Sequence, residues 1–347
     1  MGNVSVITGA TGLVGSHIAE QLCERGVAVR AVVRGQSDTR FLKTLSVEIV
    51  VADLRDLRSN PRALENAGTV YHCAAFVRDW GTWADFYDGT VEITRRLLIA
   101  CRQAGAGRFV HISSISVFGN PPESAGQITE DMPTGEHLWP GDHYGRSKIL
   151  AEQVVREYDD HVIMRPSWIY GRRDMVSIPR VLDALRRRRV KLIGSGDNLL
   201  NLVNARDVAR GVVMAADSPQ ARGQAYHLCS RGEITQREFF EFLAEHCELP
   251  RPRRRVPVRI AWTAASVLES IFRIAGSKSP PPFTRRAILM LSRPIRFSIA
   301  KAERELGWRP EIPIYDGLKE ALQWQLRASD ACLPEDVELG SSAIGQV

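Results

Sequence analysis

The chain has 347 residues, of which 44% are hydrophobic and 25% are charged. This composition supports a sizeable core, and it excludes an intrinsically disordered chain and a small disulfide-stapled domain. At roughly 150 residues per domain, the length predicts two domains or one large domain with an added lobe. Lys and Arg number 46 against 40 acidic residues, which gives a formal charge of +6 that needs an explanation.

Short β-branched runs alternate with longer amphipathic stretches through the first half of the chain. The runs predict strands at residues 4–8, 27–33, 47–51, 69–73, 108–112 and 161–164. Their nearly continuous apolar character is typical of parallel strands covered on both faces. The stretches at 13–25 and 84–104 predict crossover helices. The alternation indicates the α/β class, with a Rossmann-type doubly wound parallel sheet.

This alternation ends near residue 175, and the chain is mostly helical from residue 235. We therefore expect a smaller, mostly helical C-terminal substrate lobe that closes over the carboxyl edge of the sheet. The predicted boundaries are 1–175 plus 200–228 for the NAD(P)-binding domain and 176–199 plus 229–327 for the lobe. Residues 328–347 are expected to form a flexible tail.

The first predicted strand runs into a glycine-rich turn, TGATGLVG, that opens the first predicted helix. Glycines let the backbone approach a pyrophosphate closely, and the helix N-terminus supplies free N–H donors. We expect Gly9 to allow the tight turn, Gly12 the close approach and Gly15 the packing of helix on strand. The predicted cofactor-binding residues of this turn are Gly9, Thr11, Gly12, Leu13, Val14 and Gly15.

The end of the second predicted strand reads VVRGQS, with no acidic residue before Asp38. A carboxylate here accepts a hydrogen bond from the adenosine 2′-hydroxyl of NAD, whereas an arginine pairs with the 2′-phosphate of NADP. Arg34, with Ser37 as a second candidate, therefore favours NADP(H). NAD(H) is the alternative, in which Arg34 is a solvated loop residue of an Arg-rich protein.

Tyr144 and Lys148 are four residues apart in YGRSK, which places them on one face of a predicted helix. Ser114 follows the predicted strand at 108–112, so that its hydroxyl emerges at the same carboxyl edge. These three residue types suit proton transfer coupled to hydride transfer at a carbonyl or a secondary alcohol. We expect Tyr144 to act as general acid and base. Lys148 would lower the pKa of Tyr144 and bind the nicotinamide ribose, and Ser114 would hold the substrate oxygen.

These motifs together resemble the extended short-chain dehydrogenase/reductase family, the NAD-dependent epimerase/dehydratase superfamily, up to about residue 327. The resemblance makes Ser114, and not Ser113, the equivalent of the catalytic serine. One departure is Phe86, where many relatives have Asn, and it argues against an Asn-dependent proton relay. The resemblance also implies cofactor contacts for Asp53 and Leu54 at the adenine, for Ala74 and Ala75 along the cofactor, and for Pro166 and Ser167 beside the nicotinamide.

Within the family, RPSWIYG at 165–171 and GQAY at 223–226 look most like the 3β-hydroxysteroid dehydrogenase and dihydroflavonol reductase branch. This likeness implies a dehydrogenase or reductase that acts on CH–OH groups and interconverts a secondary alcohol and a ketone. Two other functions stay open. One is a nucleotide-sugar epimerase or dehydratase that uses the same Ser, Tyr and Lys, and the other is a non-catalytic NADP-binding regulator.

Five aromatic residues of the chain favour an apolar or polycyclic substrate, such as a hydroxysteroid-like or flavonoid-like ketone. The alternative is that these side chains simply form core. They are Trp139, Trp168, Trp262, Phe272 and Phe283.

Residues 259–276 predict an amphipathic helix that is too short and too polar to span a bilayer. We expect its apolar face to pack against the lobe. The alternative is peripheral membrane contact through residues 251–276, because arginines at 251, 253, 254, 255 and 259 lie just upstream. The apolar face comprises Ile260, Ala264, Val267, Ile271 and Ile274.

A second basic run, at residues 186–189, has no interleaved aromatic residues, so we expect a solvated helix face and no nucleic-acid partner. The six cysteines lack the spacing of a zinc site, which predicts free thiols and no metal. A strand-like run begins almost at the N-terminus, so we expect no signal peptide and a cytoplasmic protein. The resemblance also allows a homodimer built by the helices after residues 84 and 143.

Overall fold

The computed structural model describes residues 3–230, 234–292 and 295–330. A sheet of seven parallel strands has the order β11-β7-β5-β4-β1-β2-β3. The order reverses between β1 and β4, which confirms the doubly wound Rossmann-type α/β fold. The strands are β1 (Val4–Thr8), β2 (Val29–Val33), β3 (Val47–Val51), β4 (Ala67–His72), β5 (Arg108–Ile112), β7 (His161–Pro166) and β11 (Ala225–Leu228).

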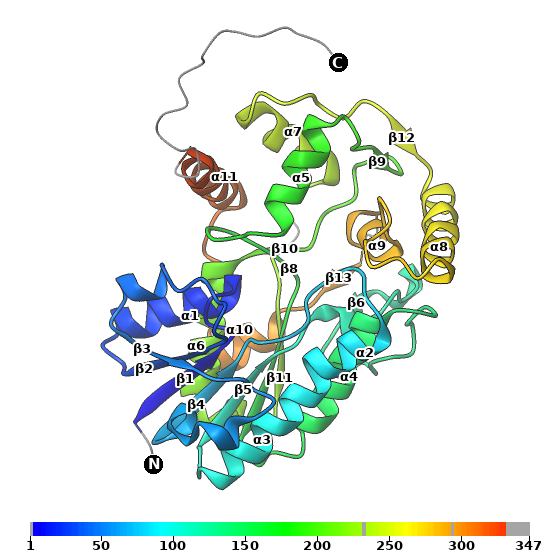
Figure 1. The fold of residues 1–347 in the computed structure, drawn as a ribbon. Coiled ribbons are helices and arrows are strands. Elements are labelled where there is room, and N and C mark those ends of the chain that lie inside the picture. Colours follow the sequence, from blue (N-terminus) through cyan, green and yellow to red (C-terminus); the bar gives the residue numbers. More distant parts are fainter. Residues whose placement is uncertain (1–2, 231–233, 293–294, 331–347) are drawn as a thin grey trace, which may run out of the picture.

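Helices cover both faces of this sheet, and Figure 1 shows α1 and α6 on one side and α3 and α4 on the other. Two separate hydrophobic clusters fill the spaces between the sheet and these helices. Burial on both faces explains the nearly unbroken apolar runs of the strands. The helices are α1 (Leu13–Glu24), α3 (Ile93–Gln103), α4 (His143–Val155) and α6 (Ala205–Asp217).

The helix predicted at 84–104 is present over residues 83–103, but its middle part is wider than an α-helix. A short α2 (Trp83–Phe86) leads into a π-helical segment, Tyr87–Glu92, before α3 begins. The inner surface of this segment is crowded, since a Cβ at Gly89 would lie 2.8 Å from the Cβ of Phe76. Wider π-helical turns are often found at functional sites.

The lobe stands over the carboxyl edge of the sheet (Figure 1). Its main core joins residues of α5, α7 and α11, and a smaller cluster lies beneath α8 and α9. Three two-stranded ribbons complete the structure: β8 (Trp168–Tyr170) with β10 (Leu202–Asn204), β9 (Leu192–Ile193) with β12 (Arg255–Val256), and β6 (Gln127–Ile128) with β13 (Arg296–Phe297). The helices are α5 (Ser177–Arg186), α7 (Gln236–His246), α8 (Val258–Ile274), α9 (Arg285–Ser292), α10 (Ala300–Leu306) and α11 (Ile314–Asp330).

The boundaries of the two regions differ in one place from those expected. Residues from Phe297 to Trp308 fall within the range predicted for the lobe, yet they pack into the core of the sheet domain. Trp308 is fully buried, and its Nε1 donates to the carbonyl of Asp207 on α6 at 2.9 Å. The buried indole, with its N–H satisfied, anchors this segment in the core of the sheet domain. Helix α11 extends to Asp330, and residues 331–347 of the expected tail lie outside the described residues.

The orientation of α8 is the opposite of the expected one. Its apolar face is exposed: Ile260 is 60% exposed, Val267 52%, Ile271 53% and Ile274 88%. The buried residues are Ala261, Ala265 and Glu269. The Glu269 carboxylate accepts from the backbone N–H and the Nε of Arg285 at 2.7 and 2.9 Å, while the two alanines allow α9 to approach closely. The face of α8 that packs on α9 is thus the one that carries the buried ion pair, and not the apolar one.

Candidate active site

The carboxyl edge of the sheet gathers all the residues that the sequence assigned to the cofactor. Because the strands are parallel, the loops that leave their carboxyl ends meet along one line. The glycine turn follows β1, Arg34 follows β2, Asp53 and Leu54 follow β3, Ala74 and Ala75 follow β4, and Pro166 and Ser167 lie at the end of β7.

The glycine turn leaves no room for a side chain at Gly9 or at Gly15. Gly9 has a φ of +68°, and a Cβ there would lie 2.7 Å from the backbone nitrogen of Ala74. A Cβ at Gly15 would lie 2.3 Å from the carbonyl oxygen of Gly9, so that Gly15 lets α1 pack against the turn. Gly12 occupies the N-cap of α1 and no side chain caps the helix. The N–H groups of the first turn of α1 therefore suit a pyrophosphate, and the residues present fit a dinucleotide.

The loop after β2 presents a cation. Arg34 is exposed at the end of β2, and among the described residues none forms a hydrogen bond with its guanidinium. The first acidic residue of the loop, Asp38, forms an ion pair with Arg40 at 2.6 Å and lies farther along the loop. Asp53 forms an ion pair with Arg55 at 2.9 Å, and hydrogen bonds from Arg55 lower the pKa of its carboxyl. The loop after β2 thus presents an exposed arginine, and the nearby acids Asp38 and Asp53 are each paired with another arginine.

Ser114, Tyr144 and Lys148 come together between β5 and α4. Asp142 caps α4 by accepting from the N–H of Gly145 at 3.0 Å, and this cap fixes the start of the helix that carries Tyr144 and Lys148. The Nζ of Lys148 donates to the carbonyl of Ile112, the last residue of β5, at 2.8 Å. All three side chains are buried, with 8%, 7% and 2% of Ser114, Tyr144 and Lys148 exposed.

The structure also separates the two neighbouring serines. Ser113 donates to the carboxylate of Glu152 at 2.6 Å, and that carboxylate is held in turn by Arg165 at 2.7 Å. Ser114 instead donates to the hydroxyl of Ser116 at 3.1 Å and accepts from the Ser116 N–H, and it is near enough to Tyr144 to lower the pKa of that phenol. Ser113 is thus held in a buried ion-pair network, whereas Ser114 lies beside the phenol.

The charge environment of Tyr144 favours its phenolate. Burial acts to raise the pKa of this phenol, but the nearby charges of Lys148 and Arg286 and the hydrogen bond with Ser114 outweigh it. The pKa of Tyr144 is consequently lowered from its ordinary value. Burial lowers the pKa of Lys148, and Tyr144 and Glu152 oppose that effect. The arrangement can hold a proton on the phenol and release it with little change in structure.

Arg286 is the site residue that the sequence did not reveal. It comes from α9 in the lobe, and its Cζ lies 3.6 Å from the centroid of the Tyr144 ring. Its Nε is 3.5 Å from the Oδ1 of Asp79, while its Nη1 is buried without a hydrogen-bond partner in the described structure. No motif surrounds Arg286, so only its place in the fold identifies it.

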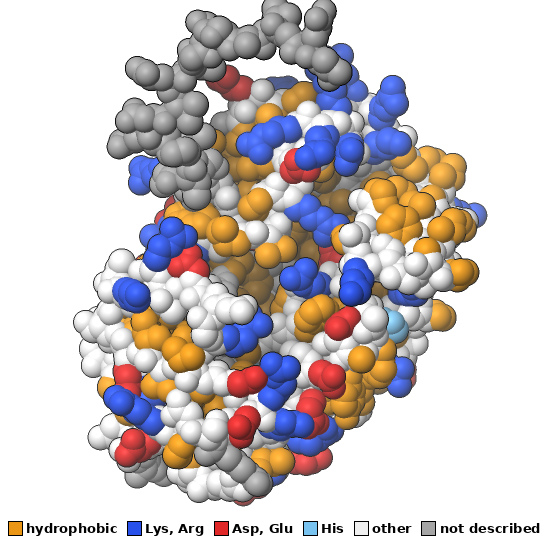
Figure 2. All heavy atoms as spheres, in the orientation of Figure 1, with side chains coloured by type: hydrophobic (Ala, Val, Ile, Leu, Met, Phe, Trp, Pro, Cys, Tyr) orange, Lys and Arg blue, Asp and Glu red, His pale blue; other side chains and the backbone are white. Residues whose placement is uncertain are grey.

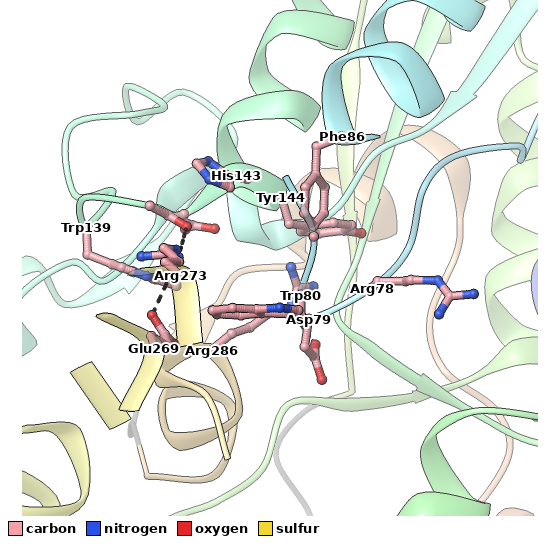
Figure 3. A pocket seen from close by; sticks show the side chains of 13 residues that line it. Arg78, Asp79, Trp80, Phe86, Trp139, His143, Tyr144, Glu269, Arg273 and Arg286 are labelled. Carbon is pink, nitrogen blue, oxygen red and sulfur yellow. Dashed lines mark hydrogen bonds and ion pairs between the residues drawn. The ribbon is translucent and has the colours of Figure 1, made fainter. Parts of the chain in front are cut away.

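A pocket opens beside Tyr144, and α8 supplies its far wall. Figure 3 shows Phe86 next to Tyr144 on one side of the pocket, and Glu269 and Arg273 on the other. The aromatic lining residues are Trp80, Phe86, Trp139 and Tyr144 itself. The Phe86 ring meets the Tyr144 ring edge to face at 6.5 Å, so an apolar ring lies against the phenol.

Most of the five aromatic residues predicted to line the substrate site pack against other side chains instead. Trp139 lines the pocket, and it stacks edge to face on Trp262 at 5.7 Å. Trp168 packs on Phe239 in the main core of the lobe, and Phe283 joins the smaller cluster beneath α8. Phe272 packs edge to face against Trp80 at 6.3 Å. The alternative interpretation, that these residues form core, therefore holds for Trp168 and Phe283.

Comparison with known proteins gives the same picture. The model of the NAD dependent epimerase/dehydratase family matches residues 5–229. A 4-hydroxy-2-methyl-3-oxo-4-farnesyl-3,4-dihydroquinoline-1-oxide ketoreductase of Stigmatella aurantiaca is 27% identical over 94% of this chain and 98% of its own. Sterol demethylase protein B of Methylococcus capsulatus is 34% identical over 88% of this chain and 93% of its own. The solved structure of MoeE5 in complex with UDP-glucose and NAD superposes with a TM-score of 0.70 at 26% identity, covering 94% of this chain and 100% of that one.

The fold, the glycine turn and the relatives named as reductases define an NAD(P)-dependent oxidoreductase. The chain belongs to the NAD dependent epimerase/dehydratase family, the extended short-chain dehydrogenases/reductases. The family predicted from the motifs is thereby confirmed. No helix in residues 3–230, 234–292 and 295–330 combines the length and the apolar character needed to cross a membrane.

Proposed function

We propose that the protein interconverts a secondary alcohol and a ketone on an apolar or polycyclic small molecule, with NADP(H) as the preferred cofactor. The observation that carries this proposal is the meeting of Ser114, Tyr144 and Lys148 beside a pocket whose lining includes Trp80, Phe86 and Trp139 among charged side chains. The ketoreductase of Stigmatella aurantiaca supports the reaction type, and the sterol-related name of the Methylococcus capsulatus relative supports a polycyclic substrate.

In this proposal the bound nicotinamide supplies or accepts the hydride, and the protein handles the proton. Ser114 donates a hydrogen bond to the substrate oxygen and holds it next to Tyr144. During ketone reduction, the Tyr144 hydroxyl gives its proton to that oxygen. During alcohol oxidation, the phenolate takes the proton back, and Lys148 and Arg286 stabilise its negative charge. The apolar ring of Phe86 helps to exclude water from the phenol.

The preference for NADP(H) rests on Arg34. Its exposed guanidinium stands at the end of β2, where a 2′-phosphate would form charge-assisted hydrogen bonds, and Asp38 is paired with Arg40. The glycine turn, Asp53, Leu54, Ala74, Ala75, Pro166 and Ser167 would hold the rest of the cofactor. Titration of both cofactors by fluorescence tests this preference, and equal or tighter binding of NAD(H) would refute it.

A nucleotide-sugar epimerase or dehydratase is the second candidate, because the similar MoeE5 structure contains UDP-glucose and NAD. The two functions differ in their net reaction. Absorbance at 340 nm with NADPH and a panel of steroid-like and flavonoid-like ketones separates them. Our proposal predicts steady loss of absorbance with at least one ketone. An epimerase shows no net change and instead converts a UDP-sugar to its epimer.

We also propose a homodimer in a reducing compartment such as the cytoplasm. The five cysteines in the described residues are free, as a reducing compartment requires. Helices α3 and α4 lie side by side and supply an outer surface on which Ile99 is 41% exposed. Light scattering should give a mass of two chains that falls to one in Ile99→Glu. A monomeric wild type would remove this part of the proposal.

A further inference from the structure

Helix α8 carries an apolar stripe that no part of the described structure covers. Ile260, Ala264, Val267, Ile271 and Ile274 recur at intervals of three and four residues, so they form one line along the 17-residue helix. Four of the five are more than half exposed. Long runs of exposed large apolar side chains are uncommon on monomeric proteins and mark contact surfaces.

The charge around this stripe has one sign. Residues 251–278 contain seven basic residues and one acid, so this segment carries +6, which equals the formal charge of the whole chain. The acid is Glu269, which is buried against Arg285 and faces inward. Arg253, Arg254 and Arg259 are exposed, and none forms an ion pair with a described residue. The surface that surrounds the stripe is therefore strongly basic, although Arg251 at its edge pairs with the exposed Glu245 at 3.3 Å.

The second basic run enlarges this surface. Because β12 pairs with β9, Arg255 lies beside Leu192, and the end of α5 reaches the same corner of the lobe. The exposed residues Arg188, Arg189 and Lys191 thus join the arginines that precede α8. Figure 2 shows the Lys and Arg side chains gathered over the lobe and the hydrophobic side chains of the α8 region at its edge.

We propose that α8 and the arginines before it dock the protein on an anionic lipid surface. An apolar stripe flanked by basic residues is the pattern of a helix that lies in the plane of a membrane interface. Arginines near such a surface are attracted by the anionic headgroups. The helix has neither the length nor the apolar character to cross the bilayer, so it lies on the surface.

A second copy of the chain fits this surface less well. In a parallel pairing of two stripes, the arginines at 253–259 of both copies would meet. In an antiparallel pairing, they would meet the exposed Lys278 at the other end of the segment. Both arrangements bring like charges together, whereas an anionic membrane presents the opposite charge to the whole segment.

The docked orientation places the pocket close to the lipid. The stripe is on the outer side of α8, while Glu269 and Arg273 on its inner side line the pocket beside Tyr144. The pocket is thus separated from the membrane by about one helix diameter, roughly 10 Å. Apolar substrates concentrate in membranes, so docking would shorten their path. Docking itself does not depend on the proposed reaction.

Flotation of the full-length protein with vesicles tests this inference. We expect it to float with vesicles of phosphatidylcholine and phosphatidylserine in a three-to-one ratio and to stay behind with phosphatidylcholine alone. High salt should release it, because salt screens the arginines. Failure to float with the anionic vesicles at low salt would overturn the proposal.

Two matched pairs of variants locate the surface. Val267→Glu with Ile271→Glu should abolish flotation, while Leu326→Glu, which alters an exposed apolar residue of α11, should not. Arg253→Gln, Arg254→Gln and Arg259→Gln together should weaken vesicle binding on the order of 100-fold. The control removes three exposed arginines of the sheet domain, Arg25, Arg62 and Arg222, and should change it little.

Melting temperature and NADPH binding show whether each variant is folded. Equal loss of flotation in both arginine triples would mean that net charge, and not this surface, attracts the protein, and would refute the proposal. So would a lipid-independent dimer in light scattering that Val267→Glu with Ile271→Glu dissociates, because the stripe would then be covered by a second copy. Both results would leave the proposed ketone reduction untouched.

Discussion

The sheet domain and the lobe both hold paired and unpaired arginines, but in different proportions near the site. In the sheet domain, three arginines with little exposure bind carboxylates: Arg165 binds Glu152 at 2.7 Å, Arg108 binds Asp160 at 2.9 Å and Arg30 binds Glu48 at 2.6 Å. In the lobe, Arg285 binds Glu269 at 2.8 Å, whereas Arg286 lies against the ring of Tyr144, and Arg253, Arg254 and Arg259 are exposed. Paired charges hold a scaffold together, whereas cations with spare hydrogen-bonding capacity are available for chemistry or for a partner.

The sheet edge should be the more sensitive region, and Tyr144 its most sensitive residue. Tyr144→Phe removes the proton carrier and keeps the ring, so kcat should fall about 100- to 10,000-fold. NADPH binding should change much less. Steady-state kinetics measures both effects, with Tyr315→Phe on the lobe surface as the control. Unchanged turnover would show that Tyr144 does not carry the proton.

At the adenosine end of the same edge, Arg34→Gln should weaken NADPH binding about 10- to 100-fold, since it removes a charge-assisted hydrogen bond to the 2′-phosphate. NADH binding should stay as it is. Arg40→Gln provides the control, because Arg40 lies in the same loop and pairs with Asp38. Equal losses for the two cofactors would show that Arg34 reads no phosphate.

The glycine turn should tolerate no added atom at Gly15. The Cβ in Gly15→Ala would lie 2.3 Å from the backbone carbonyl of Gly9, which must shift. We expect a loss of stability of about 1–3 kcal/mol and weaker NADPH binding, measured by denaturation and fluorescence. In Gly35→Ala the nearest atom is 3.9 Å away, so this variant should behave as wild type. If both variants bind NADPH normally, the turn does not cradle the pyrophosphate.

The contribution of the lobe to the chemistry is tested at Arg286. Alcohol oxidation needs the phenolate, so its rate should rise with pH through the pKa of Tyr144 and then level off. Arg286 helps to lower this pKa, so Arg286→Met should move the rising limb to higher pH. Activity lost at neutral pH should return under alkaline conditions. A profile that keeps its midpoint would assign Arg286 to structure alone.

Much of the sheet domain can be read from the sequence, because each motif is local to one strand end. Apolar runs mark strands buried on both faces. The residue spacing within TGATGLVG and within YGRSK determines the local geometry of the turn and of the helix. The helix predicted at 84–104 is present, but the local pattern did not reveal its π-helical segment at Tyr87–Glu92, which packs against Phe76 of another loop. Strand β4 begins at Ala67 rather than at residue 69, for its first residue pairs with Val4 of β1.

The lobe could not be read in the same way. The periodicity of α8 shows that one face is apolar but says nothing about what covers it. That was decided by the contact of Glu269 with Arg285, which joins residues 16 positions apart. Arg286 reaches Tyr144 across 142 positions of sequence and belongs to no motif. Long-range contacts of this kind are not encoded in local patterns.

Transfer of deuterium from NADPH labelled at C4 of the nicotinamide tests the central claim most directly. The purified protein would be mixed with labelled NADPH and an apolar ketone, and the product would be examined by mass spectrometry and NMR. We predict a released alcohol with one deuterium on the carbinol carbon and one NADP⁺ formed for each alcohol. An absence of deuterated alcohol with every ketone, together with conversion of a UDP-sugar to its epimer, would contradict the account.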